Sequence, residues 1–286
     1  MATSGPLPPS PDFDAWSEKD FAPITAFLRN QIGITLENHR MGLMQARLRS
    51  RLQAKGLTSF TQFHDQVLRQ DQSGWGTQLL IDLSTVNHTA FFREPAHFTF
   101  MAEKVVGWLK EAPGSTIRVW SAGCSSGQEP YSMAMVLAET LPPQQLPKIE
   151  IWASDLSLEM LKVAAGAIYA SRDVQGISPQ RLRRFFLLGK GPREGSFRIV
   201  PEVRDIIKFR HIDLRTPNWG VPTDLPMIFC RNVSIYFSED ERLTLIERLA
   251  QHLRPGGWLA MGNGEILPGA VPSMRKHSPS LFQKEG

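Results

Sequence analysis

The sequence predicts an α/β protein with a mostly parallel sheet, helices on both faces of that sheet, a helical domain in front of it and a small antiparallel β insertion. Three observations support this prediction. From about residue 95, short apolar runs alternate with longer amphipathic segments, which is the order of a parallel sheet with crossover helices. The residues before 84 show helical patterns, and the stretch at about 168–208 interrupts the later alternation.

Residues 17–80 are predicted to form helices. Ser17 is followed three positions later by Asp20, a spacing typical of a helix start. The clearest helix covers residues 40–55 and ends at Gly56. At about 100° per residue its apolar side chains share one stripe, which comprises Met41, Met44, Leu48 and Leu52. An adjacent stripe is basic and comprises Arg40, Arg47 and Arg51.

The sheet and its helices are predicted from the alternation that follows. Candidate strands cover residues 117–121, 149–153, 207–210, 227–230 and 257–262. Candidate helices cover residues 96–110, 129–140, 157–165 and 239–253. In the interrupting stretch, the short extended runs Ser196–Val200 and Ile206–Phe209 accompany a glycine-rich turn at 189–195, and they predict the antiparallel insertion.

Composition favours one cytoplasmic chain with two folded domains. We expect a disordered tail over 1–14, a helical domain over 15–84 and an α/β domain over 85–286 with the insertion at about 168–208. The start lacks the pattern of a secretion signal, and no run of about 18 apolar residues predicts a membrane span. The two cysteines, Cys124 and Cys230, fit a reducing compartment. We expect a monomer.

Residues 117–155 are the most informative segment. They read as a strand, a small-residue turn, a helix and a second strand that ends at Asp155. In such a βαβ unit the turn glycines let a ligand approach the backbone, and the acid accepts hydrogen bonds from ribose hydroxyls. The turn has Gly123 and Gly127 but lacks the third glycine of a dinucleotide site. The pattern favours a nucleoside without phosphates, and S-adenosylmethionine is the common one.

Three longer blocks are more specific. They read Asn-His-Thr-Ala-Phe-Phe-Arg-Glu at 87–94, Trp-Ser-Ala-Gly-Cys-Ser-Ser-Gly-Gln-Glu-Pro-Tyr-Ser at 120–132 and Met-Ile-Phe-Cys-Arg-Asn-Val-Ser-Ile-Tyr-Phe at 227–237. Together they closely resemble the CheR-type chemotaxis receptor methyltransferases, over about residues 15–268. The resemblance implies a class I S-adenosylmethionine methyltransferase with a Rossmann-like sheet. It also implies transfer of a methyl group to glutamate side chains on the cytoplasmic helices of chemoreceptors.

The resemblance implies a methyl-donor site that includes Asn87, Thr89 and Arg93. A guanidinium pairs bidentately with a carboxylate such as that of the donor's methionine part, although Arg93 could instead be a solvated arginine. Glu129 is implied to accept from the donor's ammonium group, and the alternative is a carboxylate favoured by a helix N-terminus. Asp155 is expected to bind the ribose, and its alternative role is a cap for the next helix.

Two further pairs lie at predicted strand ends, where open α/β sheets bind their ligands. Asp213-Leu214 follows one strand and Arg231-Asn232 follows another. By resemblance, the first pair lies by the adenine and the second borders the donor pocket. Tyr236 either faces the methyl acceptor, as a catalytic residue together with Arg93, or packs with Phe237.

The expected chemistry needs neither a catalytic triad nor a metal. Methyl transfer from a sulfonium releases a neutral thioether, and a glutamate carboxylate with a reference pKa of about 4.3 is already ionised at neutral pH. Such an enzyme works by positioning and desolvating its reactants. The seven histidines are scattered, and we expect structural or surface roles for them.

A receptor partner is implied on two surfaces. The Arg40/Arg47/Arg51 stripe fits an acidic helical partner, and the alternative is a solvated basic face. The turn that contains Gly191 and Gly195 is similar to the turn by which some family members bind a peptide at the receptor C-terminus, a mode in which the peptide adds a strand to a sheet edge.

Two other classes of function remain open. Gly262-Asn263-Gly264-Glu265 stands where the family usually has Gly-His-Ser-Glu, which leaves a non-catalytic receptor-docking adaptor as one alternative. A nucleic-acid methyltransferase is the other, and the sequence pI of about 9.2 permits it. The strand at 227–230 is not followed by the Pro-Pro-aromatic motif common in base methyltransferases, and we expect no nucleic-acid partner.

Overall fold

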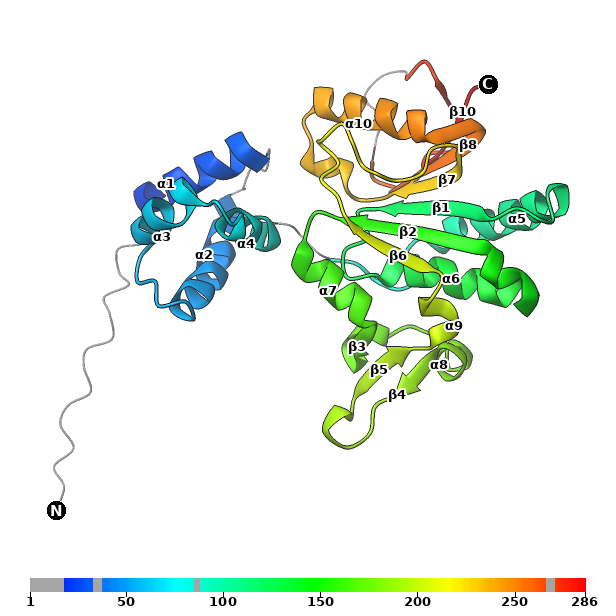
Figure 1. The fold of residues 1–286 in the computed structure, drawn as a ribbon, viewed down its shortest axis with the longest axis horizontal. Helices are drawn as coiled ribbons and strands as arrows, with labels where there is room; N and C mark the ends of the chain where they lie inside the picture. The colour runs from blue at the N-terminus through cyan, green and yellow to red at the C-terminus, as the bar shows by residue number, and fades with distance from the viewer. Residues whose placement is uncertain (1–17, 33–37, 85–87, 266–270) are drawn as a thin grey trace. The chain divides into compact units, whose positions relative to one another are not determined.

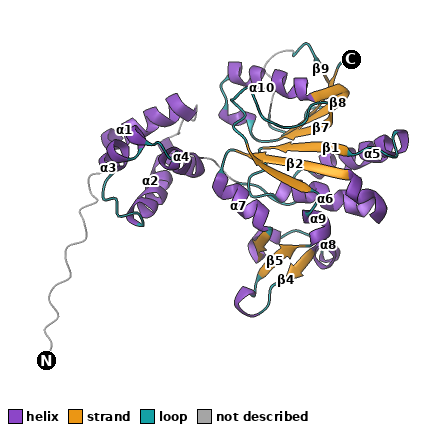
Figure 2. Ribbon diagram, in the orientation of Figure 1, coloured by secondary structure: helices purple, strands orange, loops and turns teal. Residues whose placement is uncertain are grey.

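The computed structural model describes residues 18–32, 38–84, 88–265 and 271–286 (Figures 1 and 2). Contacts within the chain divide it into two compact units, residues 1–85 and 86–286. The tail predicted at 1–14 and the cap predicted at Ser17 lie outside the described residues.

The described part of the first unit is helical. Its elements are α1 (Glu18–Phe27), η1 (Leu28–Ile32), α2 (Asn38–Gln53), α3 (Phe60–Gln66), η2 (Leu68–Gln70) and α4 (Trp75–Ser84). The predicted apolar stripe of α2 is confirmed at Met44, Leu48 and Leu52, which are buried. They belong to a core that also includes Phe21, Ile24, Leu28, Phe60, Phe63 and Leu80.

The second unit is built on a seven-stranded sheet of order β6-β2-β1-β7-β8-β10-β9. The five predicted strands are confirmed as β1 (Ile117–Ala122), β2 (Ile149–Asp155), β6 (Ile207–His211), β7 (Leu225–Cys230) and β8 (Leu253–Met261). They pair in parallel. The chain runs outward from β1 through β2 to β6 and then returns to β7 on the other side of β1. Open α/β sheets bind their ligands at such a reversal, at the carboxyl ends of the two strands beside it. We call this end of β1 and β7 the crevice.

Helices cover both faces of this sheet (Figure 1). They are α5 (Pro95–Glu111), α6 (Gln128–Thr140), α7 (Leu158–Gly166) and α10 (Glu239–His252), with the short turns η3 (Pro143–Lys148) and η6 (Ser234–Tyr236). Alternate residues of each strand belong to two separate cores, because successive side chains point to opposite faces of the sheet. Val119 of β1 packs with α5 and α6 in one core, whereas Trp120 packs with α10 in the other.

The predicted antiparallel insertion is a separate three-stranded sheet of order β3-β5-β4. Its elements are β3 (Ile168–Ala170), η4 (Ser171–Val174), α8 (Pro179–Phe185), β4 (Phe186–Leu188), η5 (Gly191–Arg193), β5 (Ser196–Ile199) and α9 (Pro201–Arg204). Of the two extended runs, Ser196–Val200 joins this sheet, but Ile206–Phe209 becomes β6 of the main sheet. The ring of Phe91 lies 4.9 Å from that of Tyr169 and 5.5 Å from that of Phe186, and so joins the 87–94 block to the insertion.

Two short strands near the C-terminal end were not predicted. β9 (Met274–Lys276) and β10 (Leu281–Lys284) continue the main sheet: β10 pairs antiparallel with β8, and β9 pairs antiparallel with β10. Phe282 of β10 is buried in the core beneath α10. The sheet is therefore parallel only in its first five strands.

Candidate functional site

The predicted donor-site residues meet at the carboxyl ends of the strands. Gly123 follows β1, Asp155 ends β2, Asp213-Leu214 follows β6 and Arg231-Asn232 follows β7. Thr89 and Arg93 come from the segment before α5. Asn87 lies outside the described residues, and for Tyr236 the structure describes the backbone of η6 alone.

The turn after β1 needs a glycine at position 123. Gly123 has a φ of +86°, and its N–H, like that of Cys124, donates to the Ser154 carbonyl over 2.8 Å. A Cβ at Gly123 would lie 2.2 Å from Cγ2 of Val233 in the segment after β7. The turns after β1 and β7 are thus in close contact at the crevice.

Gly123→Ala is expected to destabilise the protein by about 1–3 kcal/mol, from the left-handed backbone and from steric overlap, and to weaken donor binding. Adding Val233→Ala should recover the part due to overlap, and urea unfolding would measure both. Gly107 of α5 provides the control, because a Cβ there meets nothing within 4 Å. Gly107→Ala should be neutral or stabilising. An unchanged stability of Gly123→Ala would contradict the contact with Val233.

Asp155 ties the β1 turn to the end of β2. Its carboxylate accepts from the Ser125 N–H over 2.7 Å and from the Ser157 N–H over 2.9 Å. The cap of α7 is the Ser157 side chain, which accepts from the Met160 N–H over 3.1 Å. The alternative of a helix cap at Asp155 is therefore not what the structure shows.

A buried cation bridges two acids beside the turn. The side chain of Arg231 is 2% exposed, and its Nη1 lies 3.0 Å from Oε2 of Glu129 and its Nη2 lies 3.1 Å from Oε2 of Glu94. Glu129 also accepts from the Ser121 hydroxyl over 2.7 Å. Burial raises the pKa of Glu129, and the Arg231 guanidinium opposes that rise. Glu129 is therefore buried and ion-paired, whereas a carboxylate that only favoured a helix N-terminus would need no such partner.

His97 extends this cluster toward the end of the chain. Its Nε2 lies 2.7 Å from Oγ of Ser280, and its Nδ1 lies 3.5 Å from Oε2 of Glu94. Burial lowers the pKa of His97 to about 4, and the nearby Arg231 charge acts in the same direction. The ring is therefore neutral at pH 7.

The segment before α5 presents Arg93 on a constrained backbone. Phe92 and Glu94, on either side of it, have φ values of 56° and 57°. The Phe92 N–H donates to Oγ of Ser132 over 2.8 Å, and the Arg93 carbonyl accepts from Nη2 of Arg231 over 2.6 Å. The Arg93 side chain is exposed and has no ion-pair partner among the described residues. Left-handed non-glycine residues concentrate at functional sites, and Ser125 and Asn232 at this crevice are two more.

The residues that follow β6, Asp213 and Leu214, are already engaged in contacts within the protein. The Asp213 carboxylate accepts from the backbone N–H of Arg215 and from its Nε, each over 2.9 Å. Leu214 is buried and packs in the core beneath α10. Both residues follow the carboxyl end of β6, and the Asp213 carboxylate is bound by Arg215 of the same loop.

The charges at the crevice suit the donor's chemistry. Acidic side chains outnumber basic ones there: the carboxyl groups are those of Glu94, Glu129, Asp155 and Glu265, and the guanidinium groups are those of Arg93 and Arg231, while Asp213 is paired with Arg215. S-adenosylmethionine has a sulfonium, an ammonium and one carboxylate, a net charge of +1. Asp155 and Glu129 act together on the buried Cys124 thiol, whose pKa is raised by burial and then by these two charges. The residues present therefore fit this donor.

The residues predicted to bind a receptor come from α2 of the first unit and from the insertion of the second unit. Arg47 and Arg51 are exposed on α2, away from its buried stripe, and the side chain of Arg40 lies outside the described residues. Gly191 and Gly195 have φ values of 58° and 77° in the turn between β4 and β5. The close approach in that turn is made by Gly189, where a Cβ would lie 2.0 Å from the Arg193 carbonyl oxygen.

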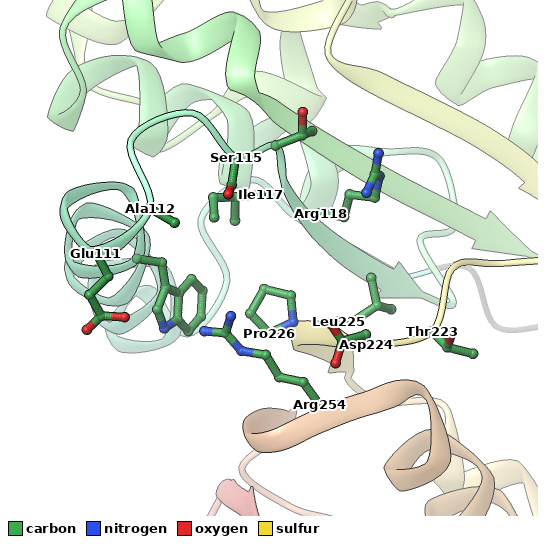
Figure 3. Close-up of a pocket in the computed structure, with 12 residues that line it drawn as sticks. Glu111, Ala112, Ser115, Ile117, Arg118, Thr223, Asp224, Leu225, Pro226 and Arg254 are labelled. Carbon is green, nitrogen blue, oxygen red and sulfur yellow. The ribbon is translucent and has the colours of Figure 1, made fainter.

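A cavity of about 380 Å³ opens at the opposite, amino-terminal ends of β1 and β7 (Figure 3). Trp108, Arg118, Asp224 and Arg254 help to line it, and the Arg254 guanidinium lies 5.0 Å from the centre of the Trp108 ring. None of the predicted site residues lines it. Within the described ranges, no group of three or more His, Cys, Asp or Glu residues could hold a metal ion, and no helix is both long and apolar enough to cross a membrane.

Two residues of the site were missed by sequence reasoning. Glu94 and Glu265 appeared in motifs without a role. His97 was expected to be structural or on the surface, and its burial agrees with a structural role. The significance of Glu94 and Glu265 depends on burial and on partners far away in the sequence, which spacing does not reveal. Two signals were available in the sequence: Glu94 directly follows Arg93, and Glu265 ends a glycine-containing turn after a predicted strand.

The fold and the crevice define a class I S-adenosylmethionine methyltransferase. Sequence comparison then gives the family. The profile described as "CheR methyltransferase, SAM binding domain" matches residues 87–281, and "CheR methyltransferase, all-alpha domain" matches residues 19–82. The chain belongs to the CheR methyltransferase family.

Named relatives agree with this assignment. The chain is 36% identical to a chemotaxis protein methyltransferase of Salmonella typhimurium, covering 94% of this chain and 91% of the relative. It is 35% identical to the Escherichia coli protein of that name, covering 88% and 85%. It is also 35% identical to chemotaxis protein methyltransferase 2 of Pseudomonas aeruginosa, covering 99% of each chain.

Proposed function

We propose that this protein transfers the methyl group of S-adenosylmethionine to glutamate carboxylates on the cytoplasmic helices of chemoreceptors, giving glutamyl methyl esters and S-adenosylhomocysteine. The observation that carries the proposal is the crevice at β1 and β7. It combines a buried Glu94–Arg231–Glu129 cluster, a strand-end Asp155 and an exposed Arg93 that has no ion-pair partner within the described part of the chain. Family membership supports the same reaction.

The residues of the crevice have separate roles in this proposal. Arg93 pairs with the donor's carboxylate, Glu129 accepts from its ammonium group, and Asp155 accepts from the ribose hydroxyls. When bound, the donor supplies an electrophilic methyl group on a sulfonium that leaves as a neutral thioether. The acceptor carboxylate provides the electron pair for the new O–C bond, so the protein need not move a proton. Its contribution is to orient the two reactants and exclude water.

The receptor is proposed to be held in two places. The basic stripe of α2 attracts an acidic helix, and the edge strands of the β3-β5-β4 sheet are open to an added peptide strand. Leu187 and Leu188 of β4 are 53% and 62% exposed, which offers apolar contacts beside that edge. Gly191 and Gly195 let the adjoining turn keep its left-handed backbone.

Asp155→Ala is expected to weaken binding of S-adenosylhomocysteine by at least about tenfold, because two ribose hydrogen bonds to a charged acceptor are lost. Calorimetric titration of the intact protein and the variant would measure this. Asp205→Ala is a matched control, because the Asp205 side chain is 67% exposed. The proposal fails if the intact protein binds neither S-adenosylmethionine nor S-adenosylhomocysteine. Methyl transfer to a receptor fragment should then give alkali-labile methyl groups, as expected of esters.

A non-catalytic adaptor is the second candidate, and it is favoured by the unusual Asn263-Gly264 pair. Both residues are exposed at the tip of the turn after β8, and a Cβ at Gly264 would meet nothing within 4 Å. The pair is thus compatible with the fold. Receptor binding without donor binding would favour the adaptor.

A further inference from the structure

Glu265 is a buried acid that the proposed reaction does not use. It is 4% exposed and lies in the turn after β8. Its Oε2 accepts from the Asn232 N–H over 2.6 Å and from the Gly262 N–H over 2.7 Å. Its Oε1 accepts from the N–H of Ser234 over 2.8 Å and from the hydroxyl of Ser234 over 2.7 Å. One carboxylate thus accepts four hydrogen bonds from two turns.

These bonds join the segments after β7 and β8, at the crevice. Asn232 has a φ of +60°, a conformation that a non-glycine residue keeps only when its surroundings hold it. A Cβ at Gly262 would lie 2.6 Å from Nδ2 of Asn232 and 2.9 Å from Oε2 of Glu265. The two turns therefore interlock, and Glu265 occupies their centre.

The segment held by Glu265 contacts the donor-site turn after β1 and leads into η6, on the proposed acceptor side. Val233, next to Asn232, closes on the Gly123 turn, where a Cβ would lie 2.2 Å from its Cγ2. Ser234 begins η6, the short helix that carries Tyr236. A shift of this segment would move the wall of the donor pocket and the start of the acceptor side together.

We propose that Glu265 is a positioning residue for methyl transfer: its carboxylate fixes the Asn232–Ser234 segment in the geometry that binds the donor and aims the acceptor. The inference rests on the proposed function. It also separates the roles within the turn 262–265: Glu265 joins the two turns with its carboxylate, whereas the exposed Asn263 contributes only its backbone N–H, which donates to Oε1 of Glu94 over 3.3 Å. Small displacements of reacting groups cost large factors in rate.

Glu265→Gln tests this role with little change in volume. The amide can turn its nitrogen toward Ser234, whose hydroxyl can accept from it, so the hydrogen bond from the Ser234 N–H is lost and the negative charge is removed. We expect S-adenosylhomocysteine binding to weaken at least about tenfold, and kcat to fall further than KM for the receptor rises, at a temperature where the variant is folded. Glu202→Gln, at an exposed position in α9, is the matched control and should change neither.

A purely structural role gives a different result. In that case the thermal midpoint falls while the Kd for S-adenosylhomocysteine and kcat of the folded variant stay within about twofold, and this outcome overturns the inference. If Glu265→Gln does not fold, Ser234→Ala removes one of the four hydrogen bonds. We expect kcat to fall about two- to fivefold, and an unchanged kcat overturns the inference as well. Failure of the intact protein to bind the donor would instead refute the proposed function.

Discussion

Arg231→Met is expected to destabilise the protein by about 3–5 kcal/mol, the usual result of removing one member of a buried ion cluster. The replacement leaves the carboxylates of Glu94 and Glu129 buried together without their cation, 15% and 12% exposed. It also removes the hydrogen bond from Nη2 of Arg231 to the Arg93 carbonyl. That bond holds in place the segment proposed to bind S-adenosylmethionine. Urea unfolding would measure the stability, and titration with S-adenosylhomocysteine would show loss of binding.

Two further variants make this expectation specific. Arg193→Met, at an exposed position in the insertion, should change stability by less than about 0.5 kcal/mol. Combining Arg231→Met with Glu129→Gln should cost less than the sum of the single changes, because the second change removes one of the stranded charges. A loss below about 1 kcal/mol for Arg231→Met alone would show that the cluster does not stabilise the fold.

Acidification from pH 6.5 to about 4 is expected to remove about 3 kcal/mol of stability through His97 alone, at about 1.4 kcal/mol per pKa unit. The pKa of His97 is lowered from 6.5 to about 4 in the folded protein. The unfolded chain therefore binds the proton first as the pH falls, and the contribution is complete only above pH 6.5. The groups facing the ring are Arg231, Glu94, Ser280 and Phe229.

Comparison with His97→Gln isolates this contribution from that of the carboxylates. The difference in unfolding free energy between the intact protein and this variant should shrink between pH 6.5 and 5. If the intact protein and His97→Gln have parallel pH profiles, the neutral buried ring is not a source of pH-dependent stability.

Sequence patterns predicted the elements whose burial is regular. The central strands were predicted because apolar runs such as β7, which is buried at every position, are continuous, and the long helix α10 separates β7 from β8. β9 was missed because it has three residues, two of them exposed cations, Arg275 and Lys276. Its place at the sheet edge depends on pairing with β10, which no local pattern specifies.

The candidate site was predictable where chemistry follows a strand end. Asp155 and the Arg231-Asn232 pair were found in this way, and the 87–94 block was found by resemblance. The partners that fix their geometry were not found, because Arg231 is bound by acids at positions 94 and 129. The roles of Asp155, Arg93 and Glu129 toward the donor remain predictions that the titrations above would test.

The bond between His97 and Ser280 has a consequence for protein synthesis. The two residues are separated by 183 positions, and His97 contacts the same Glu94 that holds Arg231. On the ribosome the N-terminal part of a chain folds as it emerges, but Ser280, the hydrogen-bond partner of His97, is translated much later. We therefore expect the crevice of a nascent chain to be complete only after the segment that contains Ser280 has left the ribosome.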